Sequence, residues 1–526
     1  MYMHPFQRKY LVLSMPFNTI QFIFLLLIVV FATYTLRRSG SLPPQYFLIF
    51  ASFGFYAIWN ISDLPVLLIS LVFNFFFAQA IFHAKARLRL ILTSVGILTN
   101  LGLLSWFKIG PGAAHGLPLG LSFFTFQQIA YLVSVYKSGA PASVANYAFV
   151  ICFFPHMVAG PLVQHGDMIA QLNSPRVFRF KRANLFAGSS LFIIGLAKKV
   201  LLADTLGLYA GNAFHLADSG VPLDCLTAWT GAIAGFLNVY FDFSGYSDMA
   251  CGIALMVGIK LPMNFYSPYK AASLDDFWHR WHITLTQFFR THLFRPLAGK
   301  RLVIRRHLAV LPFTMIAAGM WHSPSWNFFA WGLFHGVLVT IQHGFRLYLR
   351  TTPVHRKKWA HKLLGWAETQ FILILLGCFF QAKTLNGTFG MVTAMAGFSA
   401  APRAIELPSP VSPTILEATS MFLPQLQFEA GYRTDVVVAV ATIAICWSIC
   451  LFTPNSTQLL ANFRPVNDST NLLRKRQFRR TGPVLFRGRA FAAPRISWIA
   501  CMGLIFGLSL IKILLDAGLP FNYFNF

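Results

Sequence analysis

Long apolar runs separated by short basic or polar stretches make up most of the chain. A helix that crosses a bilayer needs about 20 mostly apolar residues. The apolar runs predict helices at 17–36, 45–60, 64–82, 90–107, 146–163, 185–203, 226–258, 307–321, 325–345, 364–381, 434–453 and 494–517. The run 117–136 contains Gly120, Gln127 and Gln128. We interpret it as a candidate re-entrant segment, because irregular backbone at membrane depth needs protein or water around it.

Composition supports an all-α polytopic membrane protein. Of the 526 residues, 56% are hydrophobic and 11% are charged, whereas soluble domains carry about 25% charged residues. The shortage of polar groups excludes an ordinary soluble enzyme, a disordered chain and a disulfide scaffold. The seven cysteines form no CxxC pair, and we expect them to be small apolar side chains within helices.

Charge sets the expected orientation. Lys and Arg number 43 against 16 Asp and Glu, which gives a net charge of +27. A nucleic-acid partner is not expected, because no basic groove motif with interleaved aromatic residues occurs. The positive-inside rule accounts for the surplus instead, and it predicts that the basic clusters face the cytoplasm. These clusters are 37–38, 85–89, 176–182, 295–306, 356–362 and 474–489.

The organisation expected from this pattern is a single transmembrane domain, 1–526. Residues 1–14 form an N-terminal extension, and nothing resembles a cleavable signal peptide. The Pro-rich loop 400–433 is expected outside the cell and the basic loop 455–493 inside. The parity of the helices then places both termini outside, including the tail 519–526.

Two segments carry polar groups that an apolar environment disfavours by about 2.5–3.5 kcal/mol per charge. In the first, 274–284, His279 and His282 are three residues apart, a spacing that predicts a shared helical face. In the second, 319–327, His322 lies at the end of a predicted apolar helix, which Ser323 and Pro324 terminate. Trp321 and Trp326 lie on either side of this helix end.

Three interpretations of these histidines remain open at this point. They are structural residues, metal ligands, or general acids and bases. A metal site is not expected, because the HExxH spacing is absent and no Cys or carboxylate completes a ligand set. Proton transfer suits histidine, whose unperturbed pKa is about 6.5.

Asp242 and Asp248 lie within another apolar run, 240–249. Two carboxylates at this spacing permit a glycosidase-like pair. We favour buried carboxylates bonded to hydroxyls and amides, with this segment helping to line a cavity.

Ordered motifs across the chain identify a family resemblance. They occupy 15–19, 121–133, 154–161, 195–200, 240–248, 277–284, 320–326, 454–456 and 521–526. Together they resemble the membrane-bound O-acyltransferases, and in particular the bacterial branch that acts in alginate O-acetylation and in D-alanylation of teichoic acid. The resemblance implies a helical funnel with re-entrant and amphipathic helices around a central tunnel. It also implies that His322 is the invariant histidine of the family and His282 the second, less uniform one.

The resemblance further implies a reaction. An acyl group, expected to be acetyl, comes from a cytoplasmic thioester, either acetyl-CoA or an acyl carrier. It passes across the membrane for O-acetylation of an extracytoplasmic polysaccharide, with no bound cofactor. His322 is expected to be the catalytic base, and His282 or Asn264 to orient groups or stabilise the oxyanion. Trp321, Asp242 and Asp248 are candidates for lining or positioning.

Tyr523 has two interpretations, an aromatic anchor at the membrane interface or a transient acyl carrier. Expected partners are an extracytoplasmic acyltransferase of the SGNH-hydrolase type, the donor, the polysaccharide and membrane lipid. The expected location is the bacterial cytoplasmic membrane. Four alternatives remain: an enzyme that transfers D-alanyl groups to teichoic acid, a lipid acyltransferase, a transporter without chemistry, and an interaction scaffold.

Overall fold

The computed structural model describes residues 16–138, 140–299, 303–350, 359–399, 432–467 and 496–516. Within these ranges the regular structure is helical, and an isolated β-bridge joins Pro262 to Asn467. The predicted all-α class is therefore confirmed. The extension 1–14, nearly all of the loop 400–433, the loop beyond residue 467 and the tail with Tyr523 lie outside the described residues.

The first part of the chain forms α2 (Ile20–Ser39), α3 (Pro44–Asn60), α4 (Leu64–His83), α5 (Ala86–Lys108) and α6 (Leu121–Ser138). Short helices follow: α7 (Val144–Cys152), α8 (Phe154–Met157) and α9 (His165–Leu172). Next come α10 (Arg182–Ala197), the π-helix η3 (Lys198–Ala203), α11 (Asp204–Asp218) and α12 (Cys225–Met256).

The part that forms the site is built from shorter pieces. It contains α13 (Leu274–Trp278), α14 (Ile283–Phe289), the π-helix η5 (Arg290–Phe294), α15 (Arg295–Ala298), α16 (Ile304–His322) and α17 (Trp326–Arg350). The chain continues through α18 (Trp359–Gln381), α19 (Leu385–Met395), α21 (Tyr432–Phe452), α22 (Ser456–Leu459) and α24 (Ile496–Asp516). Four short 3₁₀ helices, 61–63, 111–115, 268–270 and 461–463, complete the described elements.

Most predicted helices lie within a few residues of the observed ones, but the helix predicted at 146–163 is wrong. The chain there forms α7 and α8 and then leaves helical structure before α9. Pro155 cannot donate a backbone hydrogen bond, so a helix cannot run through it undisturbed. The N–H of Phe154 donates instead to Ser52 Oγ on α3, at 3.1 Å.

Among the described residues, six helical stretches are long and apolar enough to cross a membrane. They are Ile20–Ser39, Pro44–His83, Ala86–Lys108, Arg182–Asp218, His361–Gln381 and Ile496–Leu515. Their number indicates a multi-pass membrane protein.

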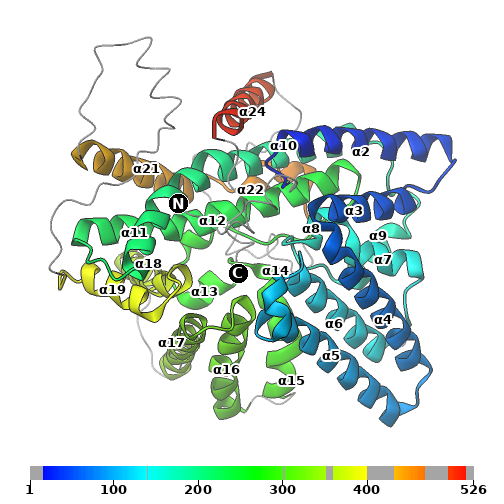
Figure 1. The fold of residues 1–526 in the computed structure, drawn as a ribbon, viewed down its shortest axis with the longest axis horizontal. Helices are drawn as coiled ribbons and strands as arrows, with labels where there is room; N and C mark the ends of the chain where they lie inside the picture. Colours follow the sequence, from blue (N-terminus) through cyan, green and yellow to red (C-terminus); the bar gives the residue numbers. More distant parts are fainter. Residues whose placement is uncertain are drawn as a thin grey trace.

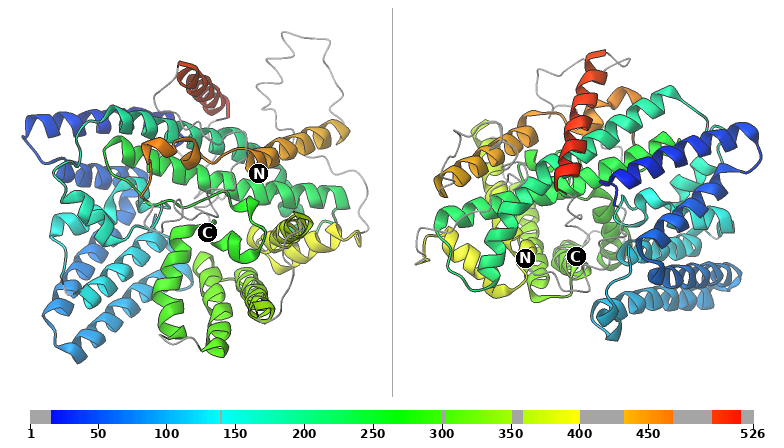
Figure 2. Two further views of the ribbon diagram at one scale, coloured as in Figure 1. Left: turned by 180° about the vertical axis from the view of Figure 1, so that it is seen from behind. Right: turned by 45° about the horizontal axis from the view of Figure 1, so that its top comes forward.

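Helices α10 and α12 pack side by side across the upper half of Figure 1, and α24 covers α10 from outside. Helices α4, α5 and α6 form a second group, and α16 and α17 an antiparallel pair. The short helices α13 and α14 lie between these groups in Figure 1, and Figure 2 shows the same set of helices from two further directions. The arrangement places the histidine segments 279–282 and 319–322 in the middle of the molecule.

Candidate functional site

His282 lies in a turn and not within a helix. Helix α13 ends at Trp278, and His282 is the residue before α14, with a positive φ of 40°. A non-glycine residue in this conformation costs on the order of 1–3 kcal/mol, and such strain concentrates at functional sites. The prediction that His279 and His282 share a helical face is wrong, because the helix is interrupted between them. His282 is 2% exposed, whereas the side chain of His279 is 46% exposed beside Asp275.

Asn264 holds the turn of His282 in place. Its carbonyl oxygen accepts a hydrogen bond from the N–H of Ile283 at 2.9 Å. Its side-chain Oδ1 lies 3.0 Å from His282 Nδ1 and 3.0 Å from Thr284 Oγ1. Its Nδ2 donates to Ser247 Oγ at 3.2 Å. Asn264 is therefore a positioning residue that contacts both the backbone and the ring of the His282 segment.

The hydrogen bonds around Asn264 also define the tautomer of His282. Leu162 donates its N–H to Thr284 Oγ1, so the Thr284 hydroxyl is left to donate to Asn264 Oδ1. The Asn264 oxygen thus faces His282, and His282 Nδ1 must carry the proton that this oxygen accepts. In the neutral ring, Nε2 then has a lone pair.

His322 is the last residue of α16, and it is 8% exposed. Lys108 at the end of α5 donates its ammonium group to the carbonyl oxygen of His322 at 2.8 Å and also to that of Trp321. A cation at this position satisfies carbonyl groups that the helix end leaves open and complements its dipole. The ring of His322 lies among aromatic side chains, with ring centroids 5.3 Å from Phe380 and 4.7 Å from Trp321.

Close packing of α16 against α17 sets the position of His322. A Cβ atom at Gly319 would lie 2.2 Å from the carbonyl oxygen of Phe328, and one at Gly336 would lie 2.4 Å from Pro312 Cα. Small residues of this kind let two membrane helices approach closely. His322 is one turn beyond Gly319, so this contact fixes where the ring stands.

The structure brings His282 and His322 together at two adjoining cavities. Both residues line one cavity of about 550 Å³ and a second of about 70 Å³. Trp278, Trp281 and Trp331 also line both cavities. The two histidines therefore stand where a larger space meets a smaller one, with tryptophan rings around them.

The larger cavity also has polar and cationic lining. Arg290, Arg295 and His307 contribute to it, together with His279 and His343. Asp275 is the carboxylate of this lining, and its Oδ1 lies 3.1 Å from His343 Nε2. The lining thus combines cationic side chains with aromatic rings and the two histidines, which suits a ligand with an anionic part and an uncharged reactive part.

The remaining candidate residues lie elsewhere. Asp242 is 1% exposed and lies 2.8 Å from Lys199 Nζ, and Asp248 lies 2.6 Å from Lys198 Nζ. Lysine ammonium groups, and not only hydroxyls and amides as predicted, are thus their partners. Neither aspartate is among the residues that line the two histidine cavities. Trp321 packs against Phe126, with ring centroids 5.1 Å apart, and does not line either histidine cavity.

Sequence reasoning missed several residues of the site. Lys108 stands 214 positions from His322, and nothing in its own segment indicates that contact. Phe123 stacks near His282 and meets Trp321 edge-on, so it links the two histidine segments. The motif around Phe123 drew attention as a family feature, but its place beside His282 needed the fold. Among the described residues, no group of three or more His, Cys, Asp or Glu side chains is arranged to hold a metal ion.

Comparison with known proteins agrees with this architecture. Residues 45–382 match the sequence profile of MBOAT, the membrane-bound O-acyltransferase family. The chain is 36% identical over 438 residues to a peptidoglycan O-acetyltransferase from Helicobacter pylori, a match that covers 73% of this chain and 80% of the relative. It is 28% identical over 540 residues to the probable alginate O-acetylase AlgI of Azotobacter vinelandii, with 97% and 100% of the two chains covered.

A more distant relative shares half of the chain. The teichoic acid D-alanyltransferase of Streptococcus thermophilus is 26% identical over 283 residues, which covers 49% of this chain and 65% of that protein.

Proposed function

Because the chain belongs to the membrane-bound O-acyltransferase family, we propose that it takes an acetyl group from a thioester donor and passes it across the membrane for O-acetylation of an extracytoplasmic polysaccharide, with His322 as the catalytic base. The protein is a multi-pass membrane O-acyltransferase. We choose acetyl as the acyl group and a polysaccharide as the acceptor because the relatives that cover most of this chain are named for these activities. Placement of His282 and His322 at the junction of two cavities is the observation that carries the proposal.

The proposed reaction needs one base and one oriented neighbour. A ring nitrogen of His322 takes the proton of the acceptor hydroxyl as the oxygen attacks the thioester carbonyl. The C–S bond then breaks, and the departing sulfur takes the proton back from the imidazolium. A positioned base contributes on the order of 10²- to 10⁴-fold. His282, with its Nε2 lone pair, accepts a hydrogen bond from substrate, so it orients the substrate and does not donate to the oxyanion.

The donor is proposed to be a cytoplasmic thioester, acetyl-CoA or an acyl carrier, which enters through the larger cavity as a substrate. Arg290, Arg295 and His307 in its lining match the phosphates of such a donor. Arg37 donates to the carbonyl of Pro175 at 3.1 Å, which brings two of the basic clusters to one end of the molecule. This contact supports a single basic face, which we propose is cytoplasmic. The extracytoplasmic C-terminus is proposed from the helix parity of the sequence alone.

Beyond His322, the acyl group must reach an acceptor outside the membrane. We propose that the smaller cavity leads toward a partner outside the bacterial inner membrane, a soluble acyltransferase of the SGNH-hydrolase type that modifies the polymer. Tyr523 is proposed either to carry the acyl group transiently or to anchor the tail at the interface. The carrier role would be excluded if the wild-type protein shows no acyl-tyrosine by mass spectrometry after donor is supplied and the Tyr523→Phe variant keeps full turnover. Only the anchor role would then remain.

The decisive experiment follows labelled acetyl groups from acetyl-CoA into polymer in membrane vesicles. We expect His322→Ala to lower transfer by at least 10²-fold, because the base is lost. His215→Ala is the matched control, since His215 is exposed on α11 and lines neither histidine cavity. Full transfer by a well-folded His322→Ala variant would contradict the role of His322. Transfer from a D-alanyl carrier in place of acetyl-CoA would favour the teichoic acid alternative.

A further inference from the structure

A third cavity, of about 350 Å³, lies beside the histidine cavity and is separated from it by one short wall. Ile283, Gln287 and Thr291 line both spaces, so α14 and η5 form this wall. The rest of the third cavity comes from α6, α9, and the segments around Lys260 and Asn467. His282 and His322 do not line it. We call this space the α9 pocket.

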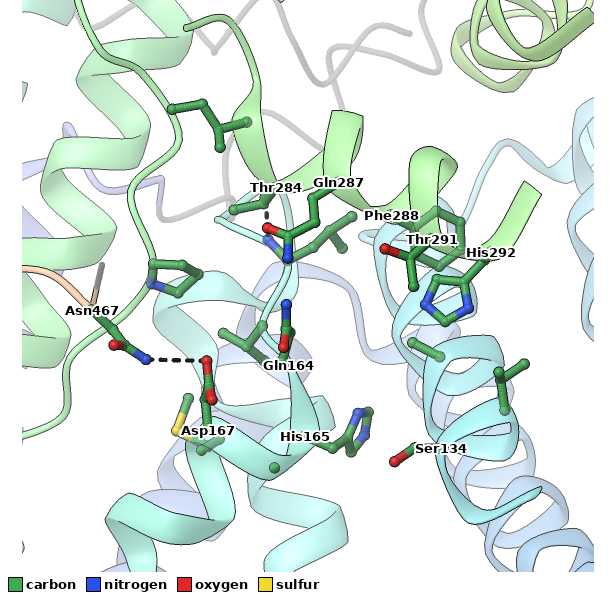
Figure 3. Close-up of a pocket in the computed structure, with 18 of the residues that line it drawn as sticks. Ser134, Gln164, His165, Asp167, Thr284, Gln287, Phe288, Thr291, His292 and Asn467 are labelled. Atoms are coloured by element: carbon green, nitrogen blue, oxygen red, sulfur yellow. Dashed lines mark hydrogen bonds between the residues drawn. The ribbon is translucent and has the colours of Figure 1, made fainter. Parts of the chain in front are cut away.

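Polar side chains converge on the α9 pocket from several elements. Figure 3 shows His165 from α9 pointing toward Ser134 of α6, with His292 of η5 above them. Gln164 and Gln287 face each other across the middle. Such a lining is more polar than packing of membrane helices requires, and it offers hydrogen bonds to a ligand from three sides.

His165 is the buried group that points to a ligand. It is 5% exposed, and its ring stacks on Tyr131 with centroids 4.9 Å apart. Its Nε2 atom is buried and has no hydrogen-bond partner in the described part of the chain. Burying a polar atom without a partner is unfavourable, because the atom has lost its hydrogen bonds to water. A hydrogen-bonding ligand in this pocket would satisfy it.

The charges around the α9 pocket favour an anion. Lys137 and Lys260 line it, and the described residues give Lys260 no ion pair. Burial lowers the pKa of Lys260, and the neighbouring Lys181 and Arg464 lower it further. Bound negative charge would relieve this crowding of cations. The one carboxylate in the lining is Asp167, whose Oδ2 accepts from Asn467 Nδ2 at 3.3 Å.

A helix N-terminus adds to the same preference. Helix α9 starts at His165, and the side chain of its N-cap residue, Gln164, makes no capping hydrogen bond. The first N–H groups of a helix have no partner within it, and together with the helix dipole they attract anions. Gly166 in this first turn keeps the backbone accessible on the pocket side.

We propose that the α9 pocket binds a phosphate ester, at a site separate from the histidine cavity. Lys260 and Lys137 supply charge, the start of α9 supplies N–H donors, and His165 Nε2 supplies the buried hydrogen bond. Two sources carry this chemistry at the basic end of the molecule, a soluble nucleotide-type phosphate and an anionic lipid headgroup. Since the pocket shares the α14–η5 wall, its occupant contacts the helix that begins directly after His282.

The test uses the full chain in nanodiscs and two probes. Binding of adenosine 3′,5′-bisphosphate is measured in phosphatidylcholine nanodiscs, and co-purifying phosphatidylglycerol is measured by native mass spectrometry. We expect Lys260→Gln to weaken binding of one probe about tenfold, because a charge-assisted contact is lost. Asp167→Asn should strengthen it about threefold, because a repulsive charge is removed.

Lys85→Gln is the matched control, since it removes one exposed charge from another basic cluster that does not line the α9 pocket. The Lys85→Gln variant should bind each probe within about twofold of wild type, as expected when a screened surface charge is removed. Retention of the bisphosphate identifies a soluble ligand, and retention of phosphatidylglycerol identifies a headgroup. Absence of both, equal losses in Lys260→Gln and Lys85→Gln, or a loss confined to Arg290→Gln of the histidine cavity would overturn the proposal. Binding should persist in His322→Ala, so failure of the proposed catalysis is seen separately.

Discussion

Lys108 at the end of α5 donates its ammonium group to the main-chain carbonyl of His322, 2.8 Å away and 214 positions later in the sequence. The contact ties the helix group α4–α6 to the α16–α17 pair at the candidate catalytic residue. It holds the backbone of His322 and leaves its imidazole ring directed among aromatic side chains.

Replacing Lys108 with Met should therefore lower turnover more than it lowers substrate affinity. A hydrogen bond to a charged group contributes about 1.5–3 kcal/mol, and a catalytic group misplaced by about 1 Å can cost 10²-fold in rate. We expect kcat to fall roughly 10- to 100-fold with KM little changed. The control is Lys85→Met, an exposed lysine at the start of α5. Unchanged kcat in Lys108→Met would show that the carbonyl contact does not position His322.

Asn264 gives a second prediction, because it contacts His282 through both its backbone and its side chain. Asn264→Leu keeps the size but removes the oxygen that accepts from His282 Nδ1. We expect kcat to fall about 10- to 100-fold, because the imidazole loses the hydrogen bond that fixes its orientation. Asn264→Asp retains an acceptor and should recover part of the rate.

The comparison of these two variants separates positioning from stability. Ser247→Ala removes only the outer hydrogen bond to Asn264 Nδ2, so it serves as the mild control. Equal activity of Asn264→Leu and Asn264→Asp, with both folded, would contradict a role through the ring of His282.

The α16–α17 contact supplies a third prediction. Gly319→Ala places a methyl group 2.2 Å from the carbonyl of Phe328, so the two helices must separate. Overpacking of this kind costs about 1–3 kcal/mol. We expect a lower melting temperature and lower acyl transfer, because His322 is one turn away. Gly344→Ala on α17 meets open space and should leave both unchanged or raise stability slightly. Equal melting temperatures for the two variants would contradict the close approach.

Lys199 supplies the fourth prediction, which concerns stability. Its ammonium group lies 2.7 Å from Asp204 and 2.8 Å from Asp242, and both Lys199 and Asp242 have side chains that are 1% exposed. Removing one partner of a buried ion pair costs about 3–5 kcal/mol, because the other charge stays buried. Lys199→Met should therefore unfold at lower temperature in detergent.

Adding Asp242→Asn to Lys199→Met removes one of the two uncompensated charges and should restore part of this loss. Additive destabilisation in the double variant would show that the two residues do not act as a pair.

The apolar pattern was enough to predict most of the helices. A run such as 64–82 is apolar on every side, and length and hydropathy alone limit it to a membrane helix. The same reasoning failed at 146–163, where the apolar run is continuous in composition but Pro155 and the contact with Ser52 break it into short helices. A hydropathy value is an average over a window of side chains, so it is insensitive to one missing backbone N–H such as that of Pro155.

The sequence by itself therefore determined the helical membrane class, the family and the two histidines that deserve testing. These features are local or linear, since they depend on apolar run lengths and on motifs read in order. The tertiary structure alone decided that His282 sits in a strained turn held by Asn264, that Lys108 binds the end of α16, and that Asp242 is paired with Lys199. Each of these joins residues on separate elements, and their contact depends on how the helices pack against one another.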